Sequence, residues 1–489
     1  MLFNSYTFIF GFLPITLIVF FGLTKFRLIG AAAIWLFIAS LAFYGYWNVA
    51  YVPLLLISML FNYQMGRQLY LAKENSKKAR ILIWVGVGLN LLFLGYYKYA
   101  NFFITSLNDL VNAHLIAPNI TLPLAISFFT FTQSAYLVDA YRGETKNYNF
   151  LTYSLFVLFF PHLIAGPIVR HDELVPQFEQ LRNYVFSHKN MAMGITLFTL
   201  GLAKKVLIAD NLSPWVAPIF AHASNCTIIE AWVGALSYTF QLYFDFSGYS
   251  DMAIGLGWMM NIDLPINFNS PYKATSIIDF WRRWHITLSN FLRDYLYIPL
   301  GGNRRGELRR YTNLLITMLL GGLWHGAGWT FVVWGGLHGL FLIINHAWRK
   351  LNIPLPKILA WALTFFAVVI SWVFFRAHTI HDGIEMVKTM LGIEPLVLPV
   401  AYKSFLGWLS LFGAQFKGWQ QLPYLPPLGG QKSIFVLAGL ILGVVLLPNT
   451  QEIIKWIKPT VLWALLVGSL AVLCLVSLNR VSEFLYFQF

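Results

Sequence analysis

Long apolar runs without a charged residue are the feature that most limits how this chain can fold. Residues 8–23, 81–95 and 434–447 are examples. About 20 predominantly apolar residues are needed for a helix to cross the hydrocarbon core of a bilayer. The whole chain is 58% hydrophobic and only 11% charged, whereas a soluble domain is about 25% charged. The sequence therefore predicts an all-α, polytopic integral membrane protein.

Basic residues between the apolar runs predict how the chain is oriented. Lys and Arg cluster at residues 25–27, 67–80 and 455–458, and cytoplasmic loops are enriched in these residue types. We therefore expect both termini on the extracytoplasmic side. Two outside termini require an even number of crossings, and the apolar runs set this number at about 10 to 14.

The net charge of +14 could indicate binding to nucleic acid or to anionic lipid. The basic residues are scattered in short loops and form no basic domain, so we expect membrane lipid as their partner and no nucleic acid. Cys226 and Cys474 are the only cysteines. Their wide separation indicates neither a disulfide framework nor a thiolate metal site.

Residues 151–313 are less regular than the rest of the chain. Proline and glycine interrupt the apolar runs there, and polar residues occur at membrane-like positions. Such segments are tolerated at membrane depth when they are packed inside protein, so we expect re-entrant or half-length helices. The sequence contains no repeat of fixed period and no linker, so residues 1–489 are expected to form one domain.

The densest group of polar residues lies at residues 280–295, which are expected to form one amphipathic helix. Spacings of three and four place four polar residues on one face: Arg282, His285, Ser289 and Arg293. One interpretation is an interfacial helix whose arginines reach the lipid head groups. The other is a polar face that lines a substrate cavity. Its candidate substrate-binding residues are Trp281, Arg282, Asn290 and Arg293.

His325 lies in the glycine-rich stretch 321–328, between two apolar runs. Ionisable groups near bilayer depth are costly and usually functional, and an imidazole suits general acid–base chemistry at neutral pH. The flanking glycines allow another backbone or a substrate to approach closely. His325 is therefore a candidate catalytic residue, and the neighbouring Trp324 is a candidate substrate-binding residue. A hydrogen bond between helices is the alternative role for His325.

Two further groups are expected to be structural. His338 follows His325 by thirteen residues, which at helical pitch does not put the two on one face. Asp245 and Asp251 lie among aromatic residues, and buried carboxylates need partners, which nearby arginines could supply. A proton relay or the lining of a cavity is the alternative role for these carboxylates. No Glu or second His lies at metal-binding spacing from His325, so no metal site is expected.

Several motifs together resemble the membrane-bound O-acyltransferase family, and within it the bacterial polysaccharide branch of the alginate O-acetylation membrane subunit. These motifs include residues 95–102, 160–170, 281–285 and 321–326. The resemblance implies that His325 is the catalytic histidine and that His285 is the second signature polar residue. It also implies acetyl transfer from a cytoplasmic donor, acetyl-CoA, outwards across the bacterial cytoplasmic (inner) membrane, with no bound cofactor.

The C-terminal tail, residues 480–489, resembles the FxYxxF motif of family members that act outside the cytoplasm. In those members the tyrosine is proposed to accept the acyl group, which implies Tyr486 as a third catalytic residue. An acyl ester of a phenol has a better leaving group than an alkyl ester, so a tyrosine can both take and pass on acetyl. An aromatic anchor at the membrane interface is the alternative.

The resemblance also implies that acetyl passes on to extracytoplasmic acetyltransferase partner proteins. Through them it would reach an exported polysaccharide such as alginate. D-alanyl transfer to teichoic acid and acetylation of peptidoglycan or cellulose remain alternative activities. Outside the enzymes, a polysaccharide transporter or a scaffold is the alternative. A transporter is expected to contain repeated halves with broken helices, and the sequence contains no such repeat.

Overall fold

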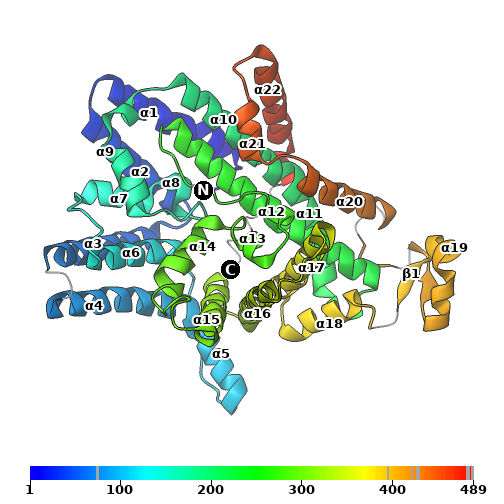
Figure 1. Ribbon diagram of the computed structural model, residues 1–489. Helices are drawn as coiled ribbons and strands as arrows, with labels where there is room; N and C mark the ends of the chain where they lie inside the picture. Colours follow the sequence, from blue (N-terminus) through cyan, green and yellow to red (C-terminus); the bar gives the residue numbers. More distant parts are fainter. Residues whose placement is uncertain (73–75, 394–395, 420–421, 426–429, 481–484, 486–489) are drawn as a thin grey trace. The chain divides into compact units, whose positions relative to one another are not determined.

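The computed structural model of the protein describes residues 1–72, 76–393, 396–419, 422–425, 430–480 and 485 (Figure 1). In this part of the chain nearly all regular structure is helical. The strands in it have three residues each, β1 (Val397–Pro399) and β2 (Gln415–Lys417), and they pair in parallel. The prediction of an all-α fold is confirmed.

Six helical segments of the described chain are long and apolar enough to cross a membrane. They are Thr7–Lys25, Val49–Leu71, Lys77–Val111, His188–Ala221, Trp329–Leu351 and Lys357–Arg376. A seventh candidate is the helix pair Lys432–Leu446 and Thr450–Trp456, bent by 60°, and two shorter apolar helices are Ile29–Gly45 and Val461–Val476. The protein is therefore a multi-pass integral membrane protein, as predicted. The expected number of about 10 to 14 crossings stays a prediction.

The chain forms two compact units, each assembled from separate stretches of sequence. Unit 1 comprises Met1–Leu202, Tyr249–Asn267 and Lys458–Leu478. Its helices are α1 (Leu13–Lys25), α2 (Ile29–Gly45), α3 (Val52–Leu71), α4 (Lys77–Leu94), α5 (Ala100–Val111), α6 (Ile126–Tyr141), α7 (Phe150–Leu158), α8 (Phe160–Leu163), α9 (His171–Glu179), α10 (His188–Ala203) and α22 (Val461–Val476). Within this unit α3, α4 and α6 pack against one another (Figure 1).

Unit 2 comprises Ala203–Gly248, Phe268–Ile457 and Asn479–Phe489. Its helices are α11 (Asp210–Ala221), α13 (Ile277–Trp281), α14 (Ile286–Leu292), α15 (Glu307–His325), α16 (Trp329–Leu351), α17 (Lys357–Arg376), α18 (Ile380–Met390), α19 (Lys403–Leu406), α20 (Gly430–Leu446) and α21 (Thr450–Trp456). Within it α16 packs against both α15 and α17 (Figure 1). Helix α12 (Ile228–Met259) contributes residues to both units. The expected single domain over residues 1–489 stays a prediction.

Residues 151–313 contain the short helices that their interrupted apolar runs predict. Helices α7, α8, α9, α13 and α14 are 9, 4, 9, 5 and 7 residues long. Helix α12 differs from this expectation, because it is continuous over 32 residues. It contains glycines but no proline, and glycine, unlike proline, keeps the backbone N–H that the helical hydrogen bonds require.

Candidate active site

His285 lies at a break between two short helices of unit 2. Helix α13 ends at Trp281 and α14 begins at Ile286. Between them His285 adopts φ 42° and ψ 55°, a left-handed conformation that costs a residue other than glycine of order 1–3 kcal/mol. The prediction of one helix over residues 280–295 is therefore wrong, because the left-handed residue interrupts the helical path. Its four polar residues do not share a helical face.

The fold brings His285 and His325 together from two separate motifs. Their ring centroids lie 6.4 Å apart. His325 is the last residue of α15, and Gly326 continues from it with an extended backbone. Both histidines are buried, with exposed fractions of 0% and 6%. The two candidate catalytic histidines therefore belong to one site within unit 2.

Aromatic rings enclose this histidine pair. Three of them surround His325, at centroid distances of 4.9, 5.1 and 5.3 Å: Trp324, Trp334 and Phe375. Phe246 meets His285 edge-on at 4.8 Å. Burial lowers the pKa of His285 to about 3, because a protonated ring would lose its hydration. His285 therefore stays neutral at physiological pH.

Two glycines allow α15 and α16 to pack backbone against backbone next to this pair. A Cβ atom on Gly322 would lie 2.2 Å from the carbonyl oxygen of Phe331, and one on Gly335 would lie 2.2 Å from that of Met318. The close approach expected at the glycines is confirmed, and the approaching backbone is that of α16. Gly322 precedes His325 by three residues. Gly335 directly follows Trp334, whose ring contacts the ring of His325. The contact between α15 and α16 therefore fixes the spacing of the His325 ring on α15 and the Trp334 ring on α16.

His338 has both ring nitrogens in hydrogen bonds. Trp281 Nε1 donates to His338 Nδ1 at 3.3 Å, and an indole nitrogen can only donate. Nδ1 is therefore the acceptor, so Nε2 carries the proton and donates to Ser371 Oγ at 2.9 Å. The Ser371 hydroxyl in turn donates to the carbonyl of Val368 at 2.7 Å. This geometry agrees with the structural role expected for His338.

Unit 2 also contains a cavity of about 460 Å³, within the size range of ligand pockets. Four of the five candidate substrate-binding residues line it: Trp281, Arg282, Asn290 and Arg293. The fifth, Trp324, packs against His325 instead. The ring centroid of Trp281 is 6.0 Å from that of Trp334, which contacts His325. Trp281 therefore connects the cavity to the histidine pair.

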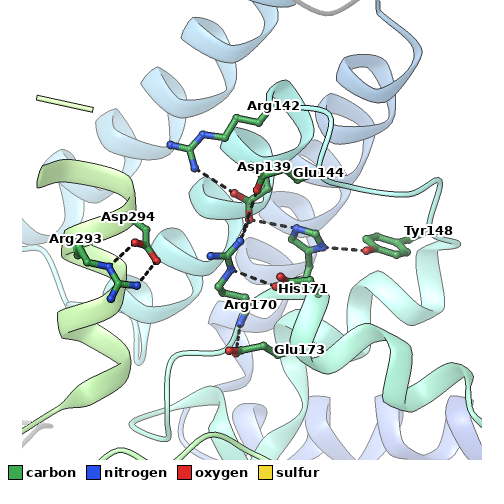
Figure 2. A network of polar contacts seen from close by, with 10 residues as sticks. Asp139, Arg142, Glu144, Tyr148, Arg170, His171, Glu173, Arg293 and Asp294 are labelled. Atoms are coloured by element: carbon green, nitrogen blue, oxygen red, sulfur yellow. Dashed lines mark hydrogen bonds and ion pairs between the residues drawn. The ribbon is translucent and has the colours of Figure 1, made fainter. Parts of the chain in front are cut away.

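Two arginines give this cavity a basic lining. Arg293 begins the π-helical segment η8 (Arg293–Tyr297). Its Nε and Nη2 atoms donate to the two carboxylate oxygens of Asp294 at 2.7 and 3.0 Å (Figure 2), a bidentate pair that orients the guanidinium. Arg282 is exposed. Guanidinium groups match the planar, bidentate geometry of phosphate and carboxylate ligands, so the cavity suits an anionic ligand.

Asp245 forms the ion pair expected from the sequence, but its partner is a lysine. Lys205 Nζ lies 2.7 Å from Asp245 Oδ1 and also 2.7 Å from Asp210 Oδ1. The expected arginine partner is therefore wrong for Asp245. Lys205 belongs to the π-helical segment η5 (Lys204–Ala209), far from Asp245 in the sequence. Asp251 is buried in unit 1, and its role stays a prediction.

A polar network in unit 1 was missed by reasoning from the sequence. His171 Nε2 lies 3.2 Å from Asp139 Oδ2, and Tyr148 is hydrogen-bonded to His171 Nδ1 at 2.9 Å (Figure 2). Arg142 and Arg170 approach the same carboxylate at 3.8 and 3.9 Å. Burial raises the pKa of Tyr148, so its hydroxyl stays protonated and can donate to the ring. Among the described residues no group of His, Cys, Asp and Glu, this network included, is arranged to hold a metal ion.

Of the C-terminal tail, the structure describes Arg480 and Leu485. The third candidate catalytic residue, Tyr486, lies outside the described residues, and its role stays a prediction. Leu485 is buried, and its main-chain amide donates a hydrogen bond to Asp245 Oδ2 at 3.1 Å. One described residue of the tail is therefore held inside unit 2.

Comparison with known proteins identifies the family in which this site occurs. The family described as MBOAT, membrane-bound O-acyltransferase, matches residues 36–380, a range that includes His285 and His325. The chain belongs to the membrane-bound O-acyltransferase family. As a member of this family it is an acyltransferase, so the predicted family and enzyme class are both confirmed.

Several relatives in this family carry more specific names. The peptidoglycan O-acetyltransferase of Helicobacter pylori is 47% identical over 428 residues, which cover 81% of this chain and 81% of the relative. The probable alginate O-acetylase AlgI of Pseudomonas aeruginosa is 46% identical over 403 residues, covering 80% and 75%. The teichoic acid D-alanyltransferase of Streptococcus thermophilus is 30% identical over 280 residues, covering 52% and 68%. Higher identity and coverage thus accompany the O-acetylating members.

Proposed function

We propose that the protein is an O-acetyltransferase that takes an acetyl group from cytoplasmic acetyl-CoA and passes it outwards for O-acetylation of an exported polysaccharide. The observation that carries the proposal is the buried pair of His285 and His325, with ring centroids 6.4 Å apart. Relatives at 47% and 46% identity are named for O-acetylation of peptidoglycan and alginate. These names support acetyl as the group and a polysaccharide as the final acceptor.

In the proposed reaction His325 is the general base. Its neutral ring accepts the proton of the acceptor hydroxyl while the hydroxyl oxygen attacks the carbonyl carbon of the acetyl thioester. A C–O bond forms, and collapse of the tetrahedral intermediate breaks the C–S bond. The thiolate takes the proton back from the imidazolium and leaves as free coenzyme A. His285 is suited to donate a hydrogen bond to the thioester oxygen as negative charge develops there.

The donor is proposed to occupy the cavity of unit 2. Arg282 and Arg293 line this cavity and would pair with phosphate groups of the donor, since arginine favours bidentate contacts with phosphate. Asn290 would add a polar contact, and Trp281 would pack along the arm that carries the thioester. Trp324, which packs against His325, would form a wall of the reaction site.

The acetyl group is proposed to leave through the C-terminal tail. Tyr486 would accept it as a phenyl ester and release it to an extracytoplasmic acetyltransferase partner protein, which would reach the polysaccharide. This relay requires the tail on the extracytoplasmic side of the bacterial cytoplasmic membrane. The distribution of Lys and Arg favours that orientation for both termini.

Complementation of a bacterial strain that lacks its own copy of this enzyme tests the proposal. Base treatment of the purified polymer releases its ester-bound groups, which are then quantified. We expect His325→Ala to lower bound acetate by about 10²- to 10⁴-fold, with normal amounts of the variant in the membrane. The exposed His378 provides a matched control, and His378→Ala should acetylate normally. Full acetylation by His325→Ala, or release of D-alanine instead of acetate, contradicts the proposal.

A further inference from the structure

Unit 2 contains a buried charged cluster that the proposed chemistry does not use. Lys205 Nζ lies 2.7 Å from one carboxylate oxygen of Asp210 and 2.7 Å from one of Asp245. All three side chains are buried, with exposed fractions of 2–3%. Two carboxylates share one ammonium group, so the cluster carries a formal charge of −1 when all three groups are ionised. A buried cluster of this charge needs further hydrogen-bond donors.

The C-terminal tail supplies such a donor. The main-chain amide of Leu485 donates to Asp245 Oδ2 at 3.1 Å, on the carboxylate whose other oxygen faces Lys205. The Leu485 side chain is itself buried, 5% exposed. Lys205 therefore orients the Asp245 carboxylate so that its second oxygen is available to the tail. Because the donor is a backbone N–H, any residue at position 485 except proline can make this contact.

The helix face that carries Asp245 has further polar groups. Tyr238, Gln241 and Asp245 follow one another on α12 at spacings of three and four, so they lie on one face. All three are buried. Among the described residues the Tyr238 hydroxyl has no hydrogen-bond partner, although buried polar groups are nearly always paired. This face is therefore equipped to bind a polar segment such as a main chain.

We propose that Lys205 and Asp245, with this face of α12, form the docking site of the C-terminal tail. Asp245 holds the amide of Leu485, and Lys205 keeps the Asp245 carboxylate in position. Tyr486 is the next residue in the sequence, so docking at Leu485 limits how far its phenol can move. These are positioning residues. Docking stands on the contacts above, and only its purpose, the placement of an acyl relay, rests on the proposed function.

Cysteine labelling of the full-length protein in detergent tests docking without any measurement of activity. Cys226 and Cys474 are replaced by alanine, Leu485→Cys is introduced, and its reaction with a maleimide is followed by mass spectrometry. We expect slow labelling when Asp245 is present. Asp245→Leu removes the acceptor of a hydrogen bond to a charged group, and labelling should become about 12- to 160-fold faster.

One variant of the cluster serves as the control. Asp210→Leu takes a carboxylate from Lys205 but leaves the acceptor of Leu485 in place, so its labelling should stay slow. Equal rates for Asp245→Leu and the parent overturn the proposal. Equally fast labelling of the Asp210→Leu and Asp245→Leu variants would also overturn it, because the effect of Asp245→Leu would then reflect a general loss of structure rather than loss of the contact with Leu485.

A second pair of variants changes the donor and leaves the cluster intact. Leu485→Pro removes the amide hydrogen, whereas Leu485→Ala keeps it, and the probe is Phe487→Cys. We expect faster labelling in the proline variant only, and equal rates overturn docking. Acetylation of Tyr486 is measured separately by peptide mass spectrometry. Protected Leu485→Cys without acetyl on Tyr486 would retain docking and remove the relay, so the two ideas fail on different results.

Discussion

Gly335→Ala tests whether the contact between α15 and α16 sets the geometry of the active site. The added Cβ would lie 2.2 Å from the carbonyl oxygen of Met318, and ordinary contact begins at 3.4 Å. The two helices must therefore separate by about 1.2 Å. Overpacking of this kind costs about 1–3 kcal/mol, of which the helix propensity of alanine returns about 0.5–1 kcal/mol. A misplacement of about 1 Å can lower a catalytic rate about 100-fold.

The neighbouring glycine of α16 provides the control for this experiment. A Cβ on Gly336 would lie 3.5 Å from Leu319 Cδ2, which is an ordinary contact. Gly336→Ala should therefore keep its activity and melt at the same temperature as wild type or slightly higher. Thermal melting of the detergent-purified proteins and acetyl incorporation in membranes are the two measurements. Wild-type rate and melting temperature in Gly335→Ala would refute this interpretation of the helix contact.

Three further predictions concern the surroundings of the histidine pair. Ser371→Ala leaves a buried imidazole N–H on α16 without its acceptor, so thermal unfolding should lose about 1–3 kcal/mol with kcat little changed; unaltered stability contradicts the assigned hydrogen bond. Arg282→Ala and Arg293→Ala should raise KM for acetyl-CoA, whereas Arg283→Ala should not, because Arg283 does not line the cavity. An unchanged KM in both Arg282→Ala and Arg293→Ala would contradict the proposal that acetyl-CoA binds in this cavity. The pKa of His285 is lowered to about 3, so between this pH and about 6.5 the unfolded chain binds a proton that the folded chain does not. The free energy of unfolding of wild type, measured against that of His285→Gln, should fall by up to about 1.4 kcal/mol per pH unit as the pH falls through this window. If the free energies of both proteins change equally with pH, the lowered pKa of His285 is contradicted.

The sequence predicts the features that depend on composition and on local motifs. Uncharged apolar runs are enough to predict helices in a membrane, because the bilayer leaves few other ways to satisfy the backbone. The glycines that flank His325 correctly predict a close approach, which occurs at Gly322. The resemblance directs attention to His285 and His325, and the structure then brings these two residues to one site.

Features that depend on a single backbone conformation or on tertiary contacts are not predictable in this way. Polar spacings of three and four persist across His285, so periodicity cannot reveal the left-handed residue that ends the helix. Lys205 lies 40 residues before Asp245 in the sequence, so nothing in the sequence favours it over a nearby arginine as the partner of Asp245. The contact of Asp139 with His171 likewise joins α6 and α9, and no spacing rule links these residues.

Acetyl transfer in inside-out membrane vesicles decides whether His325 is the catalytic base for a cytoplasmic donor. The vesicles come from cells that make the polymer and its partner proteins, and they receive acetyl-CoA labelled in the acetyl group. Wild-type vesicles should incorporate base-labile label into polymer, and right-side-out vesicles should not. His325→Ala should lower the incorporation by at least about 100-fold. Incorporation at the wild-type rate by His325→Ala vesicles would contradict the proposed mechanism.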